Sequence, residues 1–159
     1  MESERLMLED NINHDKWMLN ALSLAAKAQG GGEVPVGAVV VFNNKIIGEG
    51  WNRSIGLHDP SAHAEIQAIR AACNSLANYR LPGADLYVTL EPCPMCAGAI
   101  IHARINRVIY AAADPRTGAA QSAFQLLDSP KLNHRCEIVS GVMQEQASKM
   151  LKDFFRARR

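Results

Sequence analysis

A helix-like segment separates two apolar, strand-like segments near the middle of the chain. The residues ADLYVTL (84–90) predict a strand, PMCAGAIIHAR (94–104) a helix, and RVIYAAA (107–113) a second strand. Two strands of one sheet that are joined by a helix run parallel. This unit therefore predicts an α/β fold whose later strands are parallel to one another.

The segments before this unit extend the same pattern. Apolar residues near helical spacing between Trp17 and Ala28 predict a first helix, which the glycines at 30–32 end. The residues PVGAVVVFNNKIIGEGW (35–51) predict two strands that turn at Asn43 and Asn44, because asparagine tolerates a positive φ. A second helix is expected to begin within HDPSAHAEI, with Asp59 or Ser61 as its cap.

The segments after the unit supply the last expected elements. They predict a short helix near SAFQLL (122–127), a brief strand at CEIVS (136–140) and an amphipathic helix over 146–159. In that last helix Ala147, Met150, Leu151 and Phe154 share one side. The whole pattern predicts a three-layer α-β-α domain, with a mixed central sheet and helices on both faces.

Composition sets the size and class of the protein. The chain has 159 residues, 48% of them hydrophobic and 21% charged, which predicts one domain over 1–159 with a poorly ordered extension at 1–12. No apolar run could cross a bilayer and no signal-peptide core opens the chain, so we expect a cytoplasmic protein without a membrane partner. The net charge of +1 means that any nucleic acid must bind to a local basic patch.

His63, Cys93 and Cys96 form a candidate set of metal ligands. Cys93 is expected to cap a helix that begins at Pro94, and Cys96 lies one turn further on the same side. Cys73 and Cys136 stand apart and offer no second cysteine pair. Three protein ligands leave one position open for water, which is typical of catalytic zinc rather than of structural zinc.

Glu65 is the candidate catalytic residue beside this set. Two thiolates, one neutral imidazole and Zn²⁺ already sum to zero charge, so a carboxylate ligand would make the site anionic and fill its open position. A general base beside the water is more useful, because two thiolates partly quench the acidity of the zinc. Such a site suits hydrolytic attack on an electron-poor carbon, and H-x-E with P-C-x-x-C is the signature of zinc nucleobase deaminases.

Other interpretations of these residues remain open from the residue types alone. The cysteine pair could be a thioredoxin-like redox motif or part of a structural zinc site, and Glu65 could be an acidic residue that favours a helix dipole. Asn52 and Asp114 could simply form turns. Phe154 is expected in the core, while Phe155 lies on a neighbouring face that suits a ligand.

The chain resembles the bacterial tRNA-specific adenosine deaminases, a branch of the cytidine and deoxycytidylate deaminase superfamily. The resemblance runs from about Trp17 to the last residue. It rests on the stretches EVPVGAVVV, GEGWNR, HDPSAHAEI, LYVTLEPCPMCAGAIIHARI, DPRTGAAQS and DFFRARR. It implies a cytidine-deaminase-like fold and hydrolysis of a C–N bond of a cyclic amidine, which converts adenosine to inosine at the wobble position of a tRNA anticodon.

The resemblance also implies roles for individual residues. It implies one zinc ion per chain at His63, Cys93 and Cys96, with Glu65 as the proton shuttle. It places Asn52 against the flipped base, the Ala64 amide against the attacking oxygen, and Asp114 near the RNA. The helix that carries Phe155 and Arg156 would contact the anticodon stem-loop, and the protein would be a homodimer.

Arg156, Arg158 and Arg159 have two possible roles. They could form the basic patch that RNA requires, or they could be a solvated helix end that suits the helix dipole. Two further functions compete with tRNA deamination. One is deamination of free guanine, cytosine or a related base or nucleoside, and the other is an inactive zinc module that only binds RNA or a partner.

Overall fold

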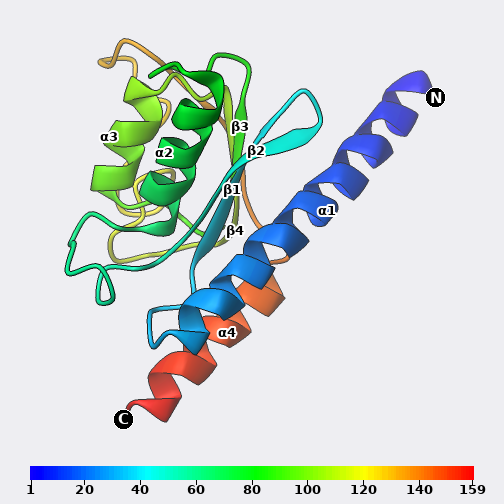
Figure 1. Ribbon diagram of the computed structural model, residues 1–159. Helices are drawn as coiled ribbons and strands as arrows, with labels where there is room; N and C mark the ends of the chain where they lie inside the picture. Colours follow the sequence, from blue (N-terminus) through cyan, green and yellow to red (C-terminus); the bar gives the residue numbers. More distant parts are fainter.

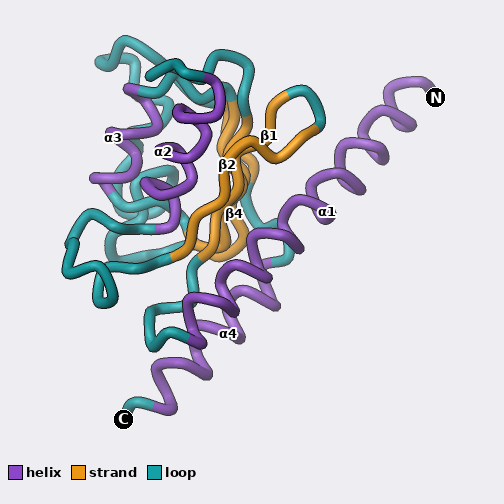
Figure 2. The backbone as a smooth tube through the Cα atoms, viewed as in Figure 1, coloured by secondary structure: helices purple, strands orange, loops and turns teal.

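The chain folds into three layers with a mixed sheet in the middle (Figures 1 and 2). The computed structural model describes residues 1–8 and 13–159 with their side chains. Within this part the sheet has the strand order β2-β1-β3-β4-β5. The helices α2 and α3 cover one face and α1 and α4 cover the other, as Figure 1 shows. The expected α-β-α architecture is confirmed.

The strands are β1 (Gly37–Phe42), β2 (Lys45–Trp51), β3 (Asp85–Leu90), β4 (Arg107–Ala112) and β5 (Glu137–Val139). β1 pairs antiparallel with both β2 and β3, whereas β3, β4 and β5 are parallel. Asn43 and Asn44 have φ values of 50° and 60°, as a tight hairpin turn between β1 and β2 requires. The predictions of the hairpin and of the parallel later strands are therefore correct.

The helices are α1 (Glu2–Gly30), α2 (Ala64–Leu76), α3 (Pro94–His102) and α4 (Gln144–Ala157). Apolar side chains from α2, α3 and one sheet face form one core cluster, and those from α1, α4 and the other face form a second. The expected burial of Ala147 and Phe154 is confirmed. Residues 9–12, part of the segment expected to be poorly ordered, lie outside the described residues, and that expectation stays a prediction.

Two local predictions are wrong. Residues 122–127 form turns and irregular backbone instead of a helix: the amides of Ala123 and Phe124 both donate to the carbonyl of Gly118 and that of Leu126 donates to Ala119, whereas in a helix each would donate to the residue four positions before it. α2 begins after His63, so neither Asp59 nor Ser61 is its cap. The Asp59 carboxylate instead accepts the backbone amide of Ser61 at 2.9 Å and closes a turn.

Candidate metal centre and active site

Two of the three residues expected to bind the metal, His63 and Cys93, are the N-caps of neighbouring helices. His63 precedes α2 and Cys93 precedes α3, both with extended backbone, and Pro94 is the first residue of α3. Proline fits this position because it needs no hydrogen-bond partner for a backbone N–H. Both helix starts lie at the same end of the sheet, and Cys96, one turn into α3, is buried beside them.

The three expected ligands are arranged as a metal requires. The Nδ1 atom of His63 lies 3.7 Å from the sulfur of Cys93 and 3.6 Å from that of Cys96. Around a tetrahedral zinc with bonds of about 2.3 Å to sulfur and 2.0 Å to nitrogen, such ligand atoms are about 3.6 Å apart. Among the described residues, these three alone form a His/Cys/Asp/Glu group that could hold a metal ion. The site therefore fits a metal with three protein ligands and lacks the fourth cysteine or histidine that a closed structural site needs.

The two sulfurs differ in their affinity for protons. The hydrogen bond with Cys96, and next the one with His63, lower the pKa of Cys93 to about 4 against the effect of burial. The pKa of Cys96 is raised by the same pairing with Cys93 and by burial. The pKa of His63 is raised by its hydrogen bond with Cys93. Both sulfurs bind a metal as thiolates, and Cys93 gives up its proton more readily than Cys96.

Glu65 lies in the first turn of α2 and is only 4% exposed. Burial raises the pKa of Glu65 to about 7, although its own amide and the charge of His63 act in the opposite direction. A carboxyl group with a pKa near neutrality can both accept and donate a proton. The structure places this group beside the metal ligands, as a general base at this site requires.

Asn52 connects β2 to the start of α2. Its side-chain oxygen accepts the amide of Ala64 at 2.9 Å, and its nitrogen donates to the carbonyl of Val34 at 3.2 Å. Each end of a carboxamide can make one more hydrogen bond, so Asn52 is still able to contact a base. The Ala64 amide already has Asn52 as its acceptor, so it can hold an attacking oxygen only by sharing its hydrogen.

Asp114 lies on the loop between β4 and β5 and organises its own turn. Its carboxylate accepts the amide of Arg116 at 3.1 Å and the hydroxyl of Thr117 at 3.0 Å. The loop and the end of α4 line a groove of about 790 Å³. Charged and aromatic residues that line this groove include Asp114, Arg116, Lys152, Phe155, Arg156 and Arg159.

At the end of α4, some aromatic and basic side chains hold the fold and others are exposed to the groove. Phe154 is buried, whereas Phe155 is 48% exposed and faces the groove. The guanidinium of Arg158 lies 3.7 Å from the centre of the Phe154 ring and donates to the carbonyl of Gly32 at 3.2 Å. Arg158 thus also fastens the helix end, a contact that neither of the two predicted roles for the arginines anticipated.

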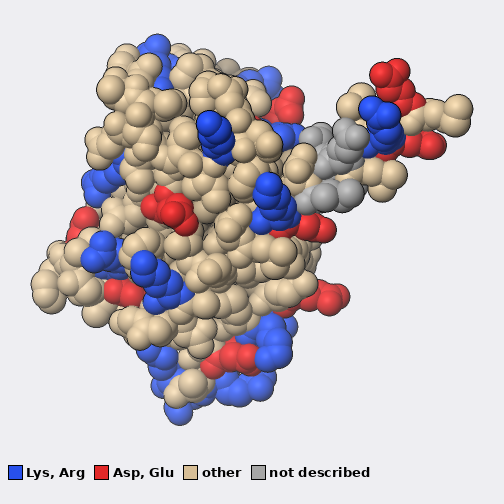
Figure 3. All heavy atoms as spheres, turned by 45° about the vertical axis from the view of Figure 1, so that its right-hand side comes forward, with Lys and Arg blue, Asp and Glu red and all other residues tan. Residues whose placement is uncertain are grey.

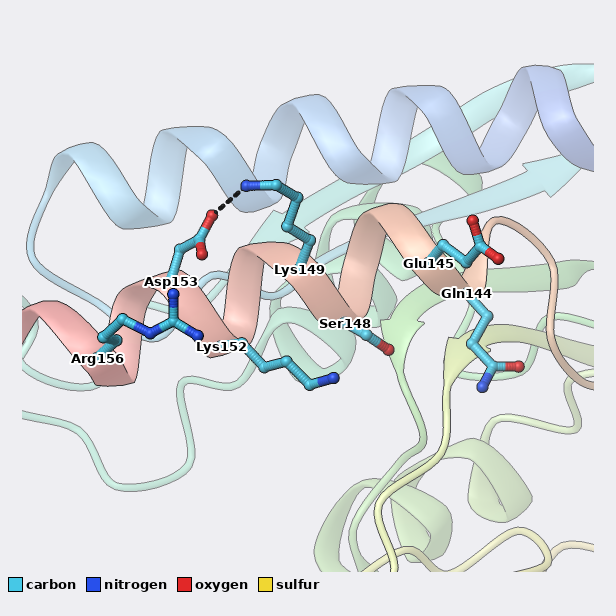
Figure 4. A pocket seen from close by; sticks show the side chains of 7 residues that line it. All are labelled: Gln144, Glu145, Ser148, Lys149, Lys152, Asp153 and Arg156. Atoms are coloured by element: carbon cyan, nitrogen blue, oxygen red, sulfur yellow. Dashed lines mark hydrogen bonds and ion pairs between the residues drawn. The ribbon is translucent and has the colours of Figure 1, made fainter.

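Lys and Arg side chains gather at the lower end of the molecule in Figure 3, where α4 ends. On the exposed side of α4, Lys149 pairs with Asp153 at 2.6 Å, as Figure 4 shows. Lys152 and Arg156 line both the shallow pocket of Figure 4 and the larger groove. Basic side chains therefore gather at the end of this helix, and their use in binding a nucleic acid stays a prediction.

Two buried carboxylates escaped the sequence analysis. Glu33, 6% exposed, accepts the amides of Ile55 at 3.0 Å and Gly56 at 2.8 Å. Glu91, 2% exposed, accepts amides of the loop after β4. Burial alone would raise the pKa of Glu91, but hydrogen bonds from Gln121, Ser122 and Asp114 lower it. In the sequence, Glu33 and Glu91 are simply glutamates close to an apolar strand. Nothing local reveals that their hydrogen-bond partners lie about twenty or more residues away.

The fold and the metal centre together define a deaminase, and comparisons with known proteins agree. The family model described as MafB19-like deaminase matches residues 12–159. A tRNA-specific adenosine deaminase of Haemophilus influenzae is 53% identical over 146 residues, which cover 91% of this chain and 84% of that protein. The chain belongs to the family of tRNA-specific adenosine deaminases.

Solved structures support the same placement. One from studies of A-to-I editing by tRNA:A34 deaminases at the wobble position superposes with a TM-score of 0.83 and is 46% identical. The match covers 86% of this chain and 99% of that one. A guanine deaminase from Nitrosomonas europaea shares the fold with a TM-score of 0.75, at 23% identity, and covers 88% of this chain and 83% of its own. That lower identity shows a common fold only.

Proposed function

We propose that this chain is a zinc-dependent deaminase that hydrolyses adenosine to inosine at the wobble position of a tRNA anticodon and releases ammonia. The observation that carries the proposal is the ligand geometry, with His63 Nδ1 at 3.7 and 3.6 Å from the two sulfurs and a buried Glu65 beside them. Membership of the family supplies the substrate, since its relatives are tRNA-specific adenosine deaminases.

The chemistry follows from Glu65. A zinc ion held by His63, Cys93 and Cys96, one per chain, would supply a Lewis acid that makes a water molecule more acidic. Glu65 accepts a proton from the attacking water as its oxygen bonds to C6 of adenine, and passes that proton to the ring nitrogen N1. Glu65 then takes the proton of the hydroxyl now on C6 and gives it to the amino nitrogen; the C6–N bond breaks, ammonia leaves, and C6 becomes the carbonyl of hypoxanthine.

The RNA would bind across the groove between the loop at 113–117 and α4. Phe155 offers an exposed ring on which a base can stack, and Arg156 and Lys152 offer positive charge for phosphates. Asp114 would contact RNA from the opposite wall of the groove. Asn52 would hold the flipped adenine with the hydrogen-bonding capacity that Ala64 and Val34 leave free.

A homodimer in the cytoplasm is part of this proposal. Exposed apolar side chains, among them Ile55, Leu57 and Phe124, provide surface that a second copy could cover. No helix in the described part of the chain has the length and apolar character to cross a membrane. Light scattering of the purified protein checks the dimer, and a monomer at micromolar concentration contradicts it.

An assay of inosine and ammonia tests the reaction. The metal-loaded protein is incubated with anticodon stem-loops that carry adenosine at the wobble position, and with free adenosine, guanine and cytosine. We expect equal amounts of inosine and ammonia from at least one stem-loop, and no turnover with Glu65→Ala. Turnover of a free base alone would show the small-molecule deaminase instead, and metal binding without any turnover would show an inactive zinc module.

A further inference from the structure

Glu91 lies between the end of β3 and the proposed metal ligand Cys93. Its carboxylate accepts hydrogen bonds from residues of the loop between β4 and β5. One oxygen accepts the amide of Asp114 at 3.0 Å and the hydroxyl of Ser122. The other accepts the amides of Ala120 at 3.1 Å, Gln121 at 2.9 Å and Ser122 at 3.0 Å. Both ends of the segment 114–122, in the first part of the loop between β4 and β5, thus converge on one buried side chain.

Other hydrogen bonds act on the loop beside those of Glu91: the amide of Gly118 donates to the carbonyl of Asp114 at 2.8 Å, and the hydroxyl of Tyr110 donates to the side chain of Gln121 at 2.7 Å. The amide of Ala119 donates to the carbonyl of Pro92 at 2.7 Å, which ties the loop to the same short segment as Glu91. Gly118 packs against the carboxylate so closely that a Cβ atom there would overlap it. Without Glu91, four backbone amides around this position would lose their acceptor, and an unpaired buried N–H costs about 1–3 kcal/mol.

This loop also forms one wall of the RNA groove proposed above. Asp114, Arg116 and Thr117 line that wall opposite Phe155 and Arg156 of α4. The amide of Asp114 is the loop's first contact with Glu91, and the Asp114 carboxylate in turn holds the amide of Arg116. One carboxylate therefore holds the wall from its buried side, together with the hydrogen bonds within the loop.

We propose that Glu91 is a positioning residue for RNA recognition, whose carboxylate fixes the loop at 114–122 and thereby the wall of the groove that meets the anticodon. The proposal rests on the function proposed above. Glu91 does not take part in proton transfer, because a carboxylate offers about four lone-pair sites and five donors already surround it. Its effect on the reaction passes through the loop.

The variant Glu91→Gln tests this without a change of shape. A glutamine presents an NH₂ group in place of one oxygen, and this group meets N–H donors whichever way the amide turns. The better orientation points it at Ser122, whose hydroxyl can rotate and accept, but the amide of Asp114 then faces another donor. The exposed Glu49 provides the matched control, Glu49→Gln, which removes the same charge from the surface strand β2.

Three measurements are made on the metal-loaded proteins: zinc content, kcat and KM with an anticodon stem-loop, and hydrogen exchange of individual amides by NMR. For Glu91→Gln we expect full zinc content, kcat within about twofold, and KM raised about tenfold, which is the effect of losing one charge-assisted hydrogen bond. We also expect faster exchange at Asp114, Ala120, Gln121 and Ser122. Glu49→Gln should match the unaltered protein in every respect.

Three results would overturn the proposal: KM unchanged despite faster exchange, loss of zinc together with activity, or unchanged exchange at the four amides. If the unaltered protein makes no inosine from any stem-loop, the proposed function fails, and the exchange measurement still decides whether Glu91 holds the loop. If Glu91→Gln does not fold, Ser122→Ala takes its place, because it removes only the hydroxyl donor. It should raise KM by about threefold with kcat unchanged, and an unchanged KM overturns the proposal.

Discussion

Asn52 holds the amide of Ala64, so the residue that ends the first hairpin also fixes the start of the helix that carries Glu65. The distance from the side-chain oxygen to this amide is 2.9 Å, and the Asn52 nitrogen reaches back to Val34 at 3.2 Å. His63, immediately before Ala64, is the N-cap of α2. The imidazole that would bind the metal is therefore positioned through a carboxamide that is not a metal ligand.

Replacement of Asn52 by alanine should affect both stability and turnover. The loss of two side-chain hydrogen bonds is expected to lower the free energy of unfolding by about 1–2 kcal/mol. Inosine formation should fall further than stability alone explains, because the hydrogen bond that positions the start of α2 and the base contact are lost together. Asn52→Asp, which keeps the acceptor for Ala64, should recover part of the stability but not the activity. Thermal unfolding and the inosine assay measure the two effects, and full activity of Asn52→Ala would contradict them.

Glu65→Gln should separate metal binding from catalysis. The variant keeps the shape of the side chain but cannot accept a proton, so kcat is expected to fall by about 10²–10⁴-fold. Zinc content should stay at one ion per chain, because Glu65 is not a proposed ligand. Elemental analysis and single-turnover kinetics test this prediction. A variant that keeps its zinc and its rate would assign the proton transfer to another group.

Removal of the metal should destabilise the protein reversibly. His63, Cys93 and Cys96 bring separate segments together, so bound metal stabilises the folded state by mass action. A strong chelator is expected to lower the unfolding temperature, and added zinc should restore both the temperature and the activity. Cys93→Ser should show the low temperature without chelator and no longer respond to zinc. Equal unfolding temperatures with and without metal would argue against this ligand set.

Gly118→Ala should be costly, and Gly98→Ala is its matched control. A Cβ at Gly118 would overlap the Glu91 carboxylate and approach the carbonyl of Asp114, whereas nothing lies within 4 Å of a Cβ at Gly98. We expect Gly118→Ala to lower the free energy of unfolding by about 1–3 kcal/mol. Gly98→Ala, inside α3, should raise it by about 0.5–1 kcal/mol. Urea unfolding distinguishes the two, and similar values for both would contradict the packing described.

Arg156→Ala and Arg158→Ala should have different consequences, although both side chains line the groove. Arg158 holds the carbonyl of Gly32 and the Phe154 ring, so its loss should lower the unfolding temperature. Arg156 lines the groove, so its loss should raise KM for the stem-loop and flatten the dependence of RNA binding on salt, with the unfolding temperature unchanged. Calorimetry and RNA titrations at two salt concentrations compare them. A weaker salt dependence for Arg158→Ala alone would reverse the two roles.

The fold was predictable where the pattern was local. Asn43 and Asn44 predicted the hairpin between β1 and β2, and the helix between β3 and β4 predicted that these two strands are parallel. Cys93 and Pro94 marked the start of α3 because capping preferences act over a few residues. The sequence could predict that His63, Cys93 and Cys96 lie together, because their spacing and residue types have a narrow chemical use.

The rest depended on contacts between distant parts of the chain. The segment at 122–127 has a helix-like composition, but its amides donate to the carbonyls of Gly118 and Ala119, in a stretch that Glu91 holds from about thirty residues earlier. Glu33 and Arg158 likewise act on partners that no local pattern reveals. Long-range hydrogen bonds therefore decided the loops around the site, while short-range preferences decided the helices and strands.

The contact between Arg158 and Gly32 has a practical consequence for protein engineering. Gly32 is followed by Glu33, which holds the loop at Ile55 and Gly56 on the way to His63. An affinity tag or fusion partner appended after Arg159 would begin one residue from this linkage. The N-terminus, at the start of α1, points away from the sheet (Figure 1). It is therefore the safer point of attachment for a fusion partner when the deaminase must stay active.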